Sequence, residues 1–289
     1  MKLYENKKTI TLFLFPALLF MTVFLFYPFF MNIIKSFYAS DGYVNSAFIG
    51  VDNYRRMLGD QTMQVAIKNT FVLMFYVVVF ELGVALILAV LVNSIPKGER
   101  FFQTVFFFPI VISATAIGMM FNLFYAYDGG LLNNIILNFG GEAKVWKSVE
   151  AALEIIAIPT IWQYIGFYFV LMLTAIKQIP KSLYESAMLD GVTGFKKLIY
   201  ITIPLIRNVL ITCLVLAITG TLKVFDLVLV ITNGGPLNAS QVLGLYMYQK
   251  TFIDEAFGYG ASISVVIVAI GLIVSFIVNR VFRQEEFTY

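Results

Sequence analysis

The sequence predicts an all-α membrane protein with six transmembrane helices, and two observations carry this prediction. First, 60% of the 289 residues are hydrophobic, only 13% are charged, and the mean hydropathy is +0.86. Ordinary soluble domains are about 45–50% apolar and about 25% charged. Second, long apolar runs recur along the chain at about the 20-residue length that a helix needs to span a bilayer. A soluble enzyme is therefore excluded.

The apolar runs that meet this length are, in order, 9–34, 69–95, 101–127, 155–176, 205–231 and 256–279. The first follows Lys7 and Lys8 but is too long for the apolar region of a signal peptide, and no small-residue cleavage site closes it. The third, fourth and sixth carry no charge. Glu81 interrupts the second run, and Lys223 and Asp226 interrupt the fifth. Ionisable groups inside a membrane are costly, so these three are functional candidates.

The positive charges near the ends of the runs predict the orientation, because loops rich in Lys and Arg stay in the cytoplasm. The side that holds both termini carries twelve lysines and arginines: Lys2, Lys7, Lys8, Lys97, Arg100, Lys177, Lys181, Lys196, Lys197, Arg207, Arg280 and Arg283. The opposite side carries six: Arg55, Arg56, Lys68, Lys144, Lys147 and Lys250. Both termini and the loops near 96–100 and 177–205 are therefore predicted to be cytoplasmic. The loops near 40–66, 128–150 and 233–255 are predicted to lie outside.

The composition also excludes several kinds of chemistry. The chain has no histidine and one cysteine, Cys213, so it holds no disulfide framework, zinc site or histidine-based triad. The net charge of +3 is too small, and too segregated between loops, to indicate a nucleic-acid surface. No outer loop has the length of an independent domain, so residues 1–289 are predicted to form a single membrane domain.

The long cytoplasmic segment 178–204 has a helical pattern of its own. Pro180 suits the first position of a helix and Gly191 suits the residue that ends one, so a short helix is predicted between them. Leu183 with Ala187, and Tyr184 with Met188, form an apolar stripe at a spacing of four. Spacing alone leaves two alternatives open: the stripe packs on the cytoplasmic ends of its own spans, or it binds a partner.

This segment resembles the EAA loop of the permeases of ABC importers. The resemblance rests on Glu-Ser-Ala-Met-Leu-Asp-Gly at 185–191, then Phe195, then Ile-Thr-Ile-Pro at 201–204. Ser186 departs from the usual alanine, a change from one small residue to another. A second block resembles the sugar-importer branch that includes the maltose channel subunits: Phe225-Asp226, 232–236 and 259–262. The likeness covers essentially the whole chain and implies the type I importer permease fold.

The resemblance implies that this chain hydrolyses nothing and binds no cofactor or metal, since ATP and Mg²⁺ belong to a partner ATPase. In the family the EAA helix sits in a cleft of the ATPase and couples ATP-driven closure to the membrane spans. The residues that would couple are Glu185 as the charged contact, Ser186, Ala187 as the small residue that permits close approach, and Asp190 and Gly191 as the turn.

The resemblance also implies the partners and the location. They are a second, similar permease chain, two ATPase subunits, an external sugar-binding protein, membrane lipid, and a sugar or oligosaccharide as the substrate, but no nucleic acid. The chain would cross the cytoplasmic membrane of a bacterium or archaeon several times and form half of a translocation pathway.

Sugars have many hydroxyl groups and apolar ring faces, so a passage for them should combine aromatic side chains with hydrogen-bonding groups. By resemblance to the maltose channel, the predicted pathway residues are Ser113, Ala114, Asn122, Thr160, Gln163, Tyr164, Phe167, Thr221, Val224 and Asp226. For most aromatic residues interhelical or lipid packing is the simpler interpretation. Two alternatives stay open for Lys223 and Asp226, which are three residues apart: they neutralise each other on one helix face, or they have a function inside the membrane. Glu81 has no evident partner.

Two other functions compete with sugar import. An importer permease for amino acids, phosphate or glycerophosphodiesters would share the EAA loop, but 232–236 favours the sugar branch. A six-span channel or membrane enzyme would need a polar filter or a set of catalytic residues, and the sequence shows neither.

Overall fold

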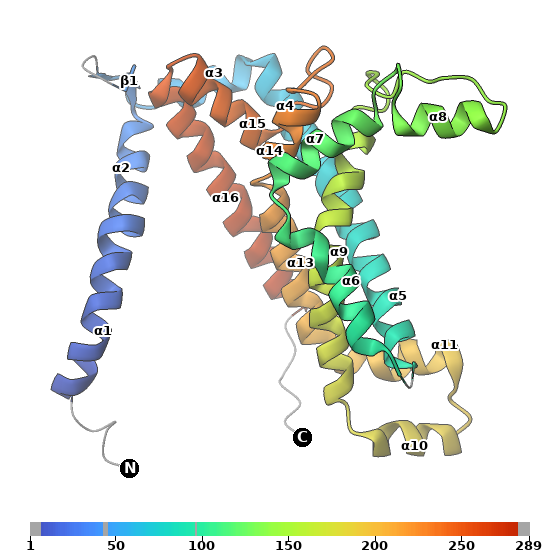
Figure 1. The fold of residues 1–289 in the computed structure, drawn as a ribbon. Helices are drawn as coiled ribbons and strands as arrows, with labels where there is room; N and C mark the ends of the chain where they lie inside the picture. Colours follow the sequence, from blue (N-terminus) through green and yellow to red (C-terminus); the bar gives the residue numbers. More distant parts are fainter. Residues whose placement is uncertain (1–6, 43–45, 96, 283–289) are drawn as a thin grey trace. The chain divides into compact units, whose positions relative to one another are not determined.

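The chain is described here from a computed structural model, which covers residues 7–42, 46–95 and 97–282 (Figure 1). Lys2 and Arg283, two of the charges used to predict orientation, lie outside these residues. The contacts divide the chain into two compact units. The first contains residues 1–60 and 247–268, and the second contains residues 61–246 and 269–289.

The first unit is built on the first apolar run and the beginning of the last one. Its elements are α1 (Lys7–Met21), the π-helical stretch η2 (Thr22–Phe26), α2 (Tyr27–Lys35), the strands β1 (Tyr38–Ser40) and β2 (Ser46–Phe48), α3 (Asp52–Gly59), η5 (Gln249–Ile253) and the first half of α16 (Phe257–Phe282). The two short strands pair antiparallel and are the only sheet within the described residues. The predicted outer loop thus contains a hairpin and a helix.

Polar side chains tie this hairpin and helix to the span ends. The Asn53 amide donates to the carbonyl oxygens of Ser36 and Tyr38, at 2.8 and 3.0 Å. The Tyr259 hydroxyl donates to the Asp60 carboxylate at 2.6 Å. A Cβ atom at Gly258 would lie 1.9 Å from the Tyr38 oxygen, so only glycine permits this approach of the two backbones.

The second unit contains the remaining spans. Its elements before the segment 178–204 are α4 (Gln61–Tyr76), the π-helical stretch η3 (Val77–Glu81), α5 (Leu82–Asn93), α6 (Glu99–Val111), α7 (Ala114–Phe124), α8 (Leu131–Asn138) and α9 (Glu154–Gln178). Within and after it come α10 (Lys181–Leu189), α11 (Gly194–Lys197), η4 (Leu198–Thr202), α12 (Ile203–Leu205), α13 (Arg207–Thr221), α14 (Asp226–Ile231) and α15 (Leu243–Tyr248). Figure 1 shows α10 and α11 at one end of this unit and α7, α8 and α14 at the other.

Four helical stretches of the described chain are long and apolar enough to cross a membrane, and two bent pairs raise this number to six. The structure thus agrees with the predicted number of spans, although the second begins at Gln61, earlier than predicted. It corrects the prediction that the third and fifth are continuous. The third breaks between α6 and α7 with a bend of 93°, and the fifth bends by 75° at Ile206 and breaks again at residues 222–225.

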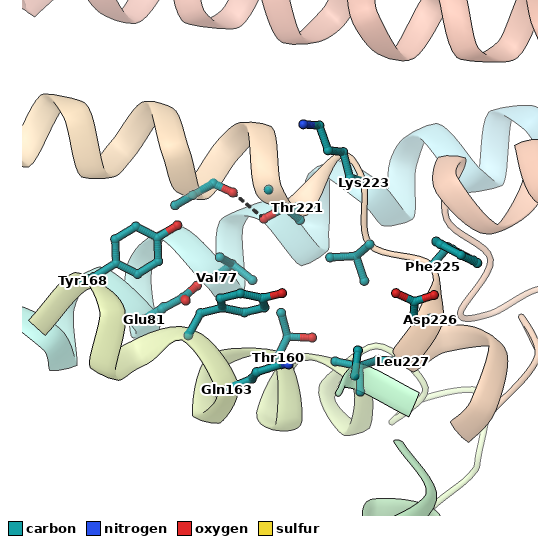
Figure 2. A pocket seen from close by; sticks show the side chains of 15 residues that line it. Val77, Glu81, Thr160, Gln163, Tyr168, Thr221, Lys223, Phe225, Asp226 and Leu227 are labelled. Atoms are coloured by element: carbon teal, nitrogen blue, oxygen red, sulfur yellow. Dashed lines mark hydrogen bonds between the residues drawn. The ribbon is translucent and has the colours of Figure 1, made fainter. Parts of the chain in front are cut away.

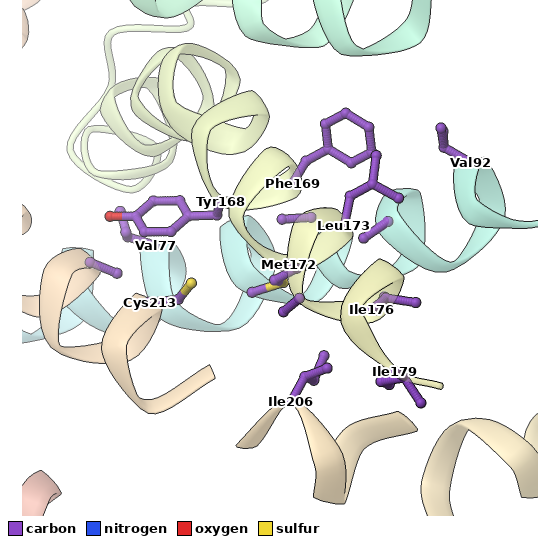
Figure 3. Close-up of a cluster of buried hydrophobic side chains, with 14 residues drawn as sticks. Val77, Val92, Tyr168, Phe169, Met172, Leu173, Ile176, Ile179, Ile206 and Cys213 are labelled. Atoms are coloured by element: carbon purple, nitrogen blue, oxygen red, sulfur yellow. The ribbon is translucent and has the colours of Figure 1, made fainter. Parts of the chain in front are cut away.

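The core of the second unit surrounds α9. Figure 3 shows its side chains between Val92 of α5 and Cys213 of α13. Phe169 and Leu173 are fully buried there. Gly166 lets α6 approach, because a Cβ atom at this position would lie 1.8 Å from the Phe106 carbonyl oxygen. Small residues that permit such backbone approach are the usual means of packing helices in lipid.

We expect Gly166→Ala to destabilise the second unit. The added methyl group would meet backbone rather than a flexible side chain, so α6 and α9 would have to separate, at a cost of about 1–3 kcal/mol or more. Gly83→Ala is the matched control, since Gly83 lies in α5 and a Cβ atom there would have nothing within 4 Å. Thermal unfolding of the purified variants in detergent measures the difference. Equal melting temperatures for the two variants would contradict the close packing at Gly166.

Candidate functional site

A cavity of about 230 Å³ lies inside the second unit, where the third and fifth spans break (Figure 2). Its walls come from η3, the start of α7, α9, the end of α13, and the break that leads into α14. The lining residues are Val77, Glu81, Ala114, Thr160, Gln163, Tyr164, Tyr168, Ala217, Gly220, Thr221, Lys223, Val224, Phe225, Asp226 and Leu227. The surface therefore combines hydroxyl, amide, carboxyl and aromatic groups.

The break in the third span is stabilised by local hydrogen bonds. Ile112 is extended, so the helical ladder stops there, and the Ser113 hydroxyl caps α7 by accepting from the Ala116 N–H at 3.2 Å. The Gln163 amide of α9 donates to the freed Ile112 carbonyl at 3.1 Å. Gln163 thereby supplies a partner for backbone that would otherwise be unpaired in the membrane.

The break in the fifth span is an irregular segment from Leu222 to Phe225. Backbone hydrogen bonds of a turn end α13: the Lys223 N–H donates to the Gly220 carbonyl oxygen at 3.0 Å. Beyond the break, α14 packs on α7, where a Cβ atom at Gly118 would lie 2.9 Å from the Val230 Cβ. The Asn122 amide of α7 donates to the Val230 oxygen at 3.1 Å. The second halves of the two broken spans, α7 and α14, thus contact and stabilise each other.

Two lining threonines bond to their own helices. The Thr160 hydroxyl donates to the Ile156 oxygen at 2.7 Å, and the Thr221 hydroxyl donates to the Ala217 oxygen at 2.8 Å. Each hydroxyl has used its one hydrogen in this way and keeps its oxygen as an acceptor. Both residues are buried.

Glu81 ends the π-helical stretch η3 and is 1% exposed. Stretches of π-helix are common at functional sites, and here the stretch supplies Val77 and Glu81 to the cavity. Within the described chain the Glu81 Oε1 atom has no hydrogen-bond partner, and neither has Gln163 Oε1. Figure 2 shows Glu81 on the side of the cavity where Tyr168 lies and Asp226 toward the other end.

Seven of the ten predicted pathway residues line this cavity: Ala114, Thr160, Gln163, Tyr164, Thr221, Val224 and Asp226. The other three do not. Ser113 caps α7, Phe167 packs against the hydrophobic core, and Asn122 joins α7 to α14 and accepts a hydrogen bond from Lys147. Lys147 belongs to the outer segment after α8, and its burial there lowers the pKa of its ammonium group.

The structure contradicts the alternative in which Lys223 and Asp226 neutralise each other on one helix face. Lys223 lies in the irregular segment and Asp226 begins α14, so they do not share one helix face. No ion pair joins them among the described residues, and Figure 2 shows the Lys223 ammonium group directed away from Asp226.

The structure adds lining residues that the sequence did not identify, namely Val77, Tyr168, Ala217, Gly220, Phe225 and Leu227. Tyr168 follows Tyr164 by one helical turn, a spacing that would have included it. Glu81 and Lys223 were noted only as charges inside spans, with no site assigned to them.

The segment α10 presents two different faces. Leu183 and Tyr184 pack against the core cluster, and the Tyr184 hydroxyl lies 3.2 Å from the Thr202 hydroxyl. Glu185, Met188 and Leu189 are exposed, Leu189 to 90%. The packing of Leu183 and Tyr184 confirms the alternative that this stripe covers the unit's own spans. The other face is exposed within the described chain, and its binding to a partner stays a prediction.

The ends of α10 follow the sequence pattern with one shift. Pro180 precedes the first helical residue instead of occupying it. Gly191 has a φ of +75°, and the N–H of Val192 donates to the Ala187 oxygen at 2.8 Å, as in a glycine-ended helix. Ala187 itself is buried at 7% exposure. Within the described chain Ala187 therefore packs on this chain itself, whereas Ser186 and Asp190 are exposed, and the coupling roles of all three stay predictions.

The sequence profile of one family matches residues 81–285, and its description is "Binding-protein-dependent transport system inner membrane component". The probable ABC transporter permease protein YurN of Bacillus subtilis is 32% identical, over 98% of each chain. The lactose transport system permease protein LacF of Rhizobium radiobacter is 32% identical, over 95% of this chain and 94% of LacF.

A chain in the crystal structure of a bacterial alginate ABC transporter, bound to a periplasmic protein that carries an alginate pentasaccharide, has the same fold. The TM-score is 0.84, the match covers 98% of each chain, and 22% of the residues are identical.

We expect a cysteine at Tyr164 to react with a charged methanethiosulfonate reagent and a cysteine at Ile158 to remain unmodified. Both are on α9 and both are partly exposed, at 37% and 54%, but only Tyr164 lines the polar cavity. Thiols react as thiolates and need water to ionise. Cys213 is fully buried, so the wild-type chain serves as the background. Mass spectrometry after labelling in membranes counts the adducts, and an unreactive Tyr164→Cys would show that water does not enter the cavity.

Proposed function

The chain belongs to the family of binding-protein-dependent transport system inner membrane components, and from this premise we propose that it imports a sugar or an oligosaccharide. Family membership makes it a multi-pass inner membrane permease subunit and not an enzyme. The substrate class, the other subunits and the orientation of the chain form the proposal.

The chemistry of the cavity carries the assignment of the substrate class. Tyr164 and Tyr168 offer aromatic surface, and Thr160, Gln163 and Thr221 offer hydrogen-bonding groups beside them. A sugar has an apolar ring face with hydroxyl groups around its edge, and this combination of groups complements it. The name of LacF, which states lactose transport, supports the same class.

The exposed face of α10 supplies the contact with an ATPase. Glu185 offers a charge there, and Met188 and Leu189 offer apolar surface. The opposite face packs on the core cluster, which includes Ile206 at the bend before α13. A displacement of α10 would therefore press on α13, whose last residues line the cavity. ATP and Mg²⁺ would bind to the ATPase, and this chain would convert its closure into movement of the spans.

The rest of the proposed assembly follows from the position of the chain in such a system. A second permease chain would complete the pathway, and two ATPase subunits would act on the two cytoplasmic loops. An external binding protein would deliver the sugar to the outer segments, with both termini of this chain in the cytoplasm of a bacterium or archaeon. The ion pair between Lys177 and Glu99, at 2.6 Å, joins the last turn of α9 to the first turn of α6. The loops near 96–100 and 177–205 therefore lie on the same side of the membrane, which supports the proposed orientation.

Deletion of the gene tests the substrate class. We expect the deletion strain to lose accumulation of at least one labelled sugar from a panel of mono-, di- and trisaccharides, and a plasmid copy to restore it. Uptake of amino acids, phosphate and glycerophosphodiesters is measured in the same cells. Loss of one of these solutes, with all sugars unaffected, would contradict the proposal and favour another branch of importers.

We expect Leu189→Ser and Gly191→Pro to weaken retention of the ATPase without loss of the chain from the membrane. Leu189 is 90% exposed on α10, so its replacement removes docking surface without touching the core. Proline fixes φ near −65° and cannot adopt the +75° of Gly191, so the turn after α10 would change. Copurification of the ATPase with the tagged chain provides the measurement. Leu237→Ser, an exposed leucine in an outer segment at 91%, is the control. Full retention of the ATPase by both α10 variants would exclude α10 as the docking element.

A further inference from the structure

The short helix α8 lies between the third and fourth spans and carries no charged residue. It reads Leu-Leu-Asn-Asn-Ile-Ile-Leu-Asn over Leu131–Asn138, and Phe139 follows it directly. Isolated helices shorter than about 12–15 residues are marginal in water, so a helix of this length depends on an apolar face that packs against other groups. α8 therefore needs a surface to pack on.

One side of α8 is covered by the segment that follows it. Asn133 is fully buried, and its amide donates to the carbonyl oxygens of Tyr127 and Lys144, at 3.0 Å each. The Asn133 Oδ1 atom accepts from the Lys144 N–H at 3.0 Å and from the Trp146 indole N–H at 2.9 Å. These bonds use both donors and both acceptor positions of the amide. The side of α8 that holds Asn133 is thus fixed to residues 144–146.

The opposite side of α8 is largely apolar and exposed. Leu131 and Ile135 each lie two residues from the buried asparagine, which places them about 160° from it around a helix of about 3.6 residues per turn. Both are exposed, and so is Phe139, at 88%. Their polar neighbours on this side, Asn134 and Asn138, are uncharged. Within the described chain α8 therefore leaves an apolar edge uncovered.

The direction of this edge follows from the position of α8. Figure 1 shows α8 lying across the direction of α5 and α9 at the end of the unit, and the segment that returns to α9 passes on the side of α8 away from these spans. Because Leu131 and Ile135 lie opposite that segment, they are directed toward the level of the spans. The covering segment carries the exposed charged residues Glu142 and Lys144. α8 thus separates apolar residues on the side of the spans from charged residues on the other side.

The apolar surface also continues from the third span to α8. Leu123 near the end of α7 and Tyr127 in the turn after it are both exposed. A tyrosine near the end of a span is typical of the interface between membrane and water. Asp128, in the same turn, is the only charged residue from Leu123 to Phe139. The lipid that surrounds the spans of this inner membrane component therefore borders α8 as well.

We propose that α8 is an interfacial helix, which lies in the headgroup region of the bilayer and inserts Leu131, Ile135 and Phe139 among the lipids. A helix in this position gains binding free energy from the apolar area that it buries in the bilayer. Residues 125–130 alone separate α7 from α8. A helix held at this depth therefore also fixes the position of α7, whose first residue, Ala114, lines the cavity. The inference requires the membrane location of the family and is independent of the solute.

Nitroxide labels test this position in the assembled transporter. Ile135 and Phe139 are replaced singly by cysteine and labelled, and the purified complex is reconstituted in nanodiscs of phosphatidylcholine and phosphatidylglycerol without the binding protein. The labelled wild-type complex, in which Cys213 is fully buried, supplies the background. Lys144→Cys and Leu237→Cys are the controls, since both residues are exposed, the first on the covering segment and the second between α14 and α15. Power-saturation EPR measures collisions with oxygen, which concentrates in lipid, and with a water-soluble nickel chelate.

We expect the ratio of oxygen to nickel collisions to be about five-fold higher at Ile135→Cys and Phe139→Cys than at either control, because lipid surrounds the first pair and water the second. The Phe139 side chain is exposed, so its replacement disturbs little packing and decides the question if Ile135→Cys fails to assemble. Ratios at these two positions no higher than those of the controls would overturn the inference. The exposed edge of α8 would then belong to a soluble partner, such as an external binding protein.

Discussion

The second unit depends on one constraint, which is that every backbone polar group inside a membrane needs a partner. Two of its spans break at the same cavity, after Val111 and after Thr221, and each break frees carbonyl and N–H groups. Gln163 satisfies the carbonyl of Ile112, Ser113 caps α7, and local turns close the end of α13. Irregular backbone survives at membrane depth only where protein covers it or where it lines a cavity. Part of the polar lining, Gln163 in particular, is therefore a consequence of the breaks.

The cavity is also connected through packed helices to the segment 178–204. On its buried face α10 contacts the core cluster through Leu183 and Tyr184, and α13 starts at the bend beside Ile206. From there α13 runs without interruption to Thr221 in the cavity wall. Closely packed side chains do not deform continuously, so movement of α10 would be transmitted as displacement of whole helices. The outer halves α7 and α14, joined by Asn122 and by the close approach at Gly118, would follow as a pair.

Much of this arrangement was predictable from the sequence, and the remainder has identifiable physical causes. The apolar runs located the spans, because hydrophobic length is the dominant signal in a membrane. Pro180 and Gly191 located α10 through their own backbone preferences. The breaks were not predictable. Pro109 lies inside α6 and leaves it helical, and no proline or glycine occupies 222–225, so tertiary contacts decide where the helices stop. Of the pathway residues that resemblance predicts, Gln163 and Thr221 line the cavity. Asn122 does not line it, because its amide donates to the backbone of α14, a contact between helices that spacing along one helix does not reveal. The role of all three in transport stays a prediction.

The unpaired oxygen of Glu81 is the cost that the fold leaves uncompensated. A leucine at this position would pack in η3 at no electrostatic penalty, and the neighbouring Val77 shows that the same wall accepts an apolar side chain. The Oε1 atom of this carboxyl group has no hydrogen-bond partner within the described chain. Its burial is therefore destabilising by itself, and the packing around it offsets this cost only through the apolar contacts of its neighbours.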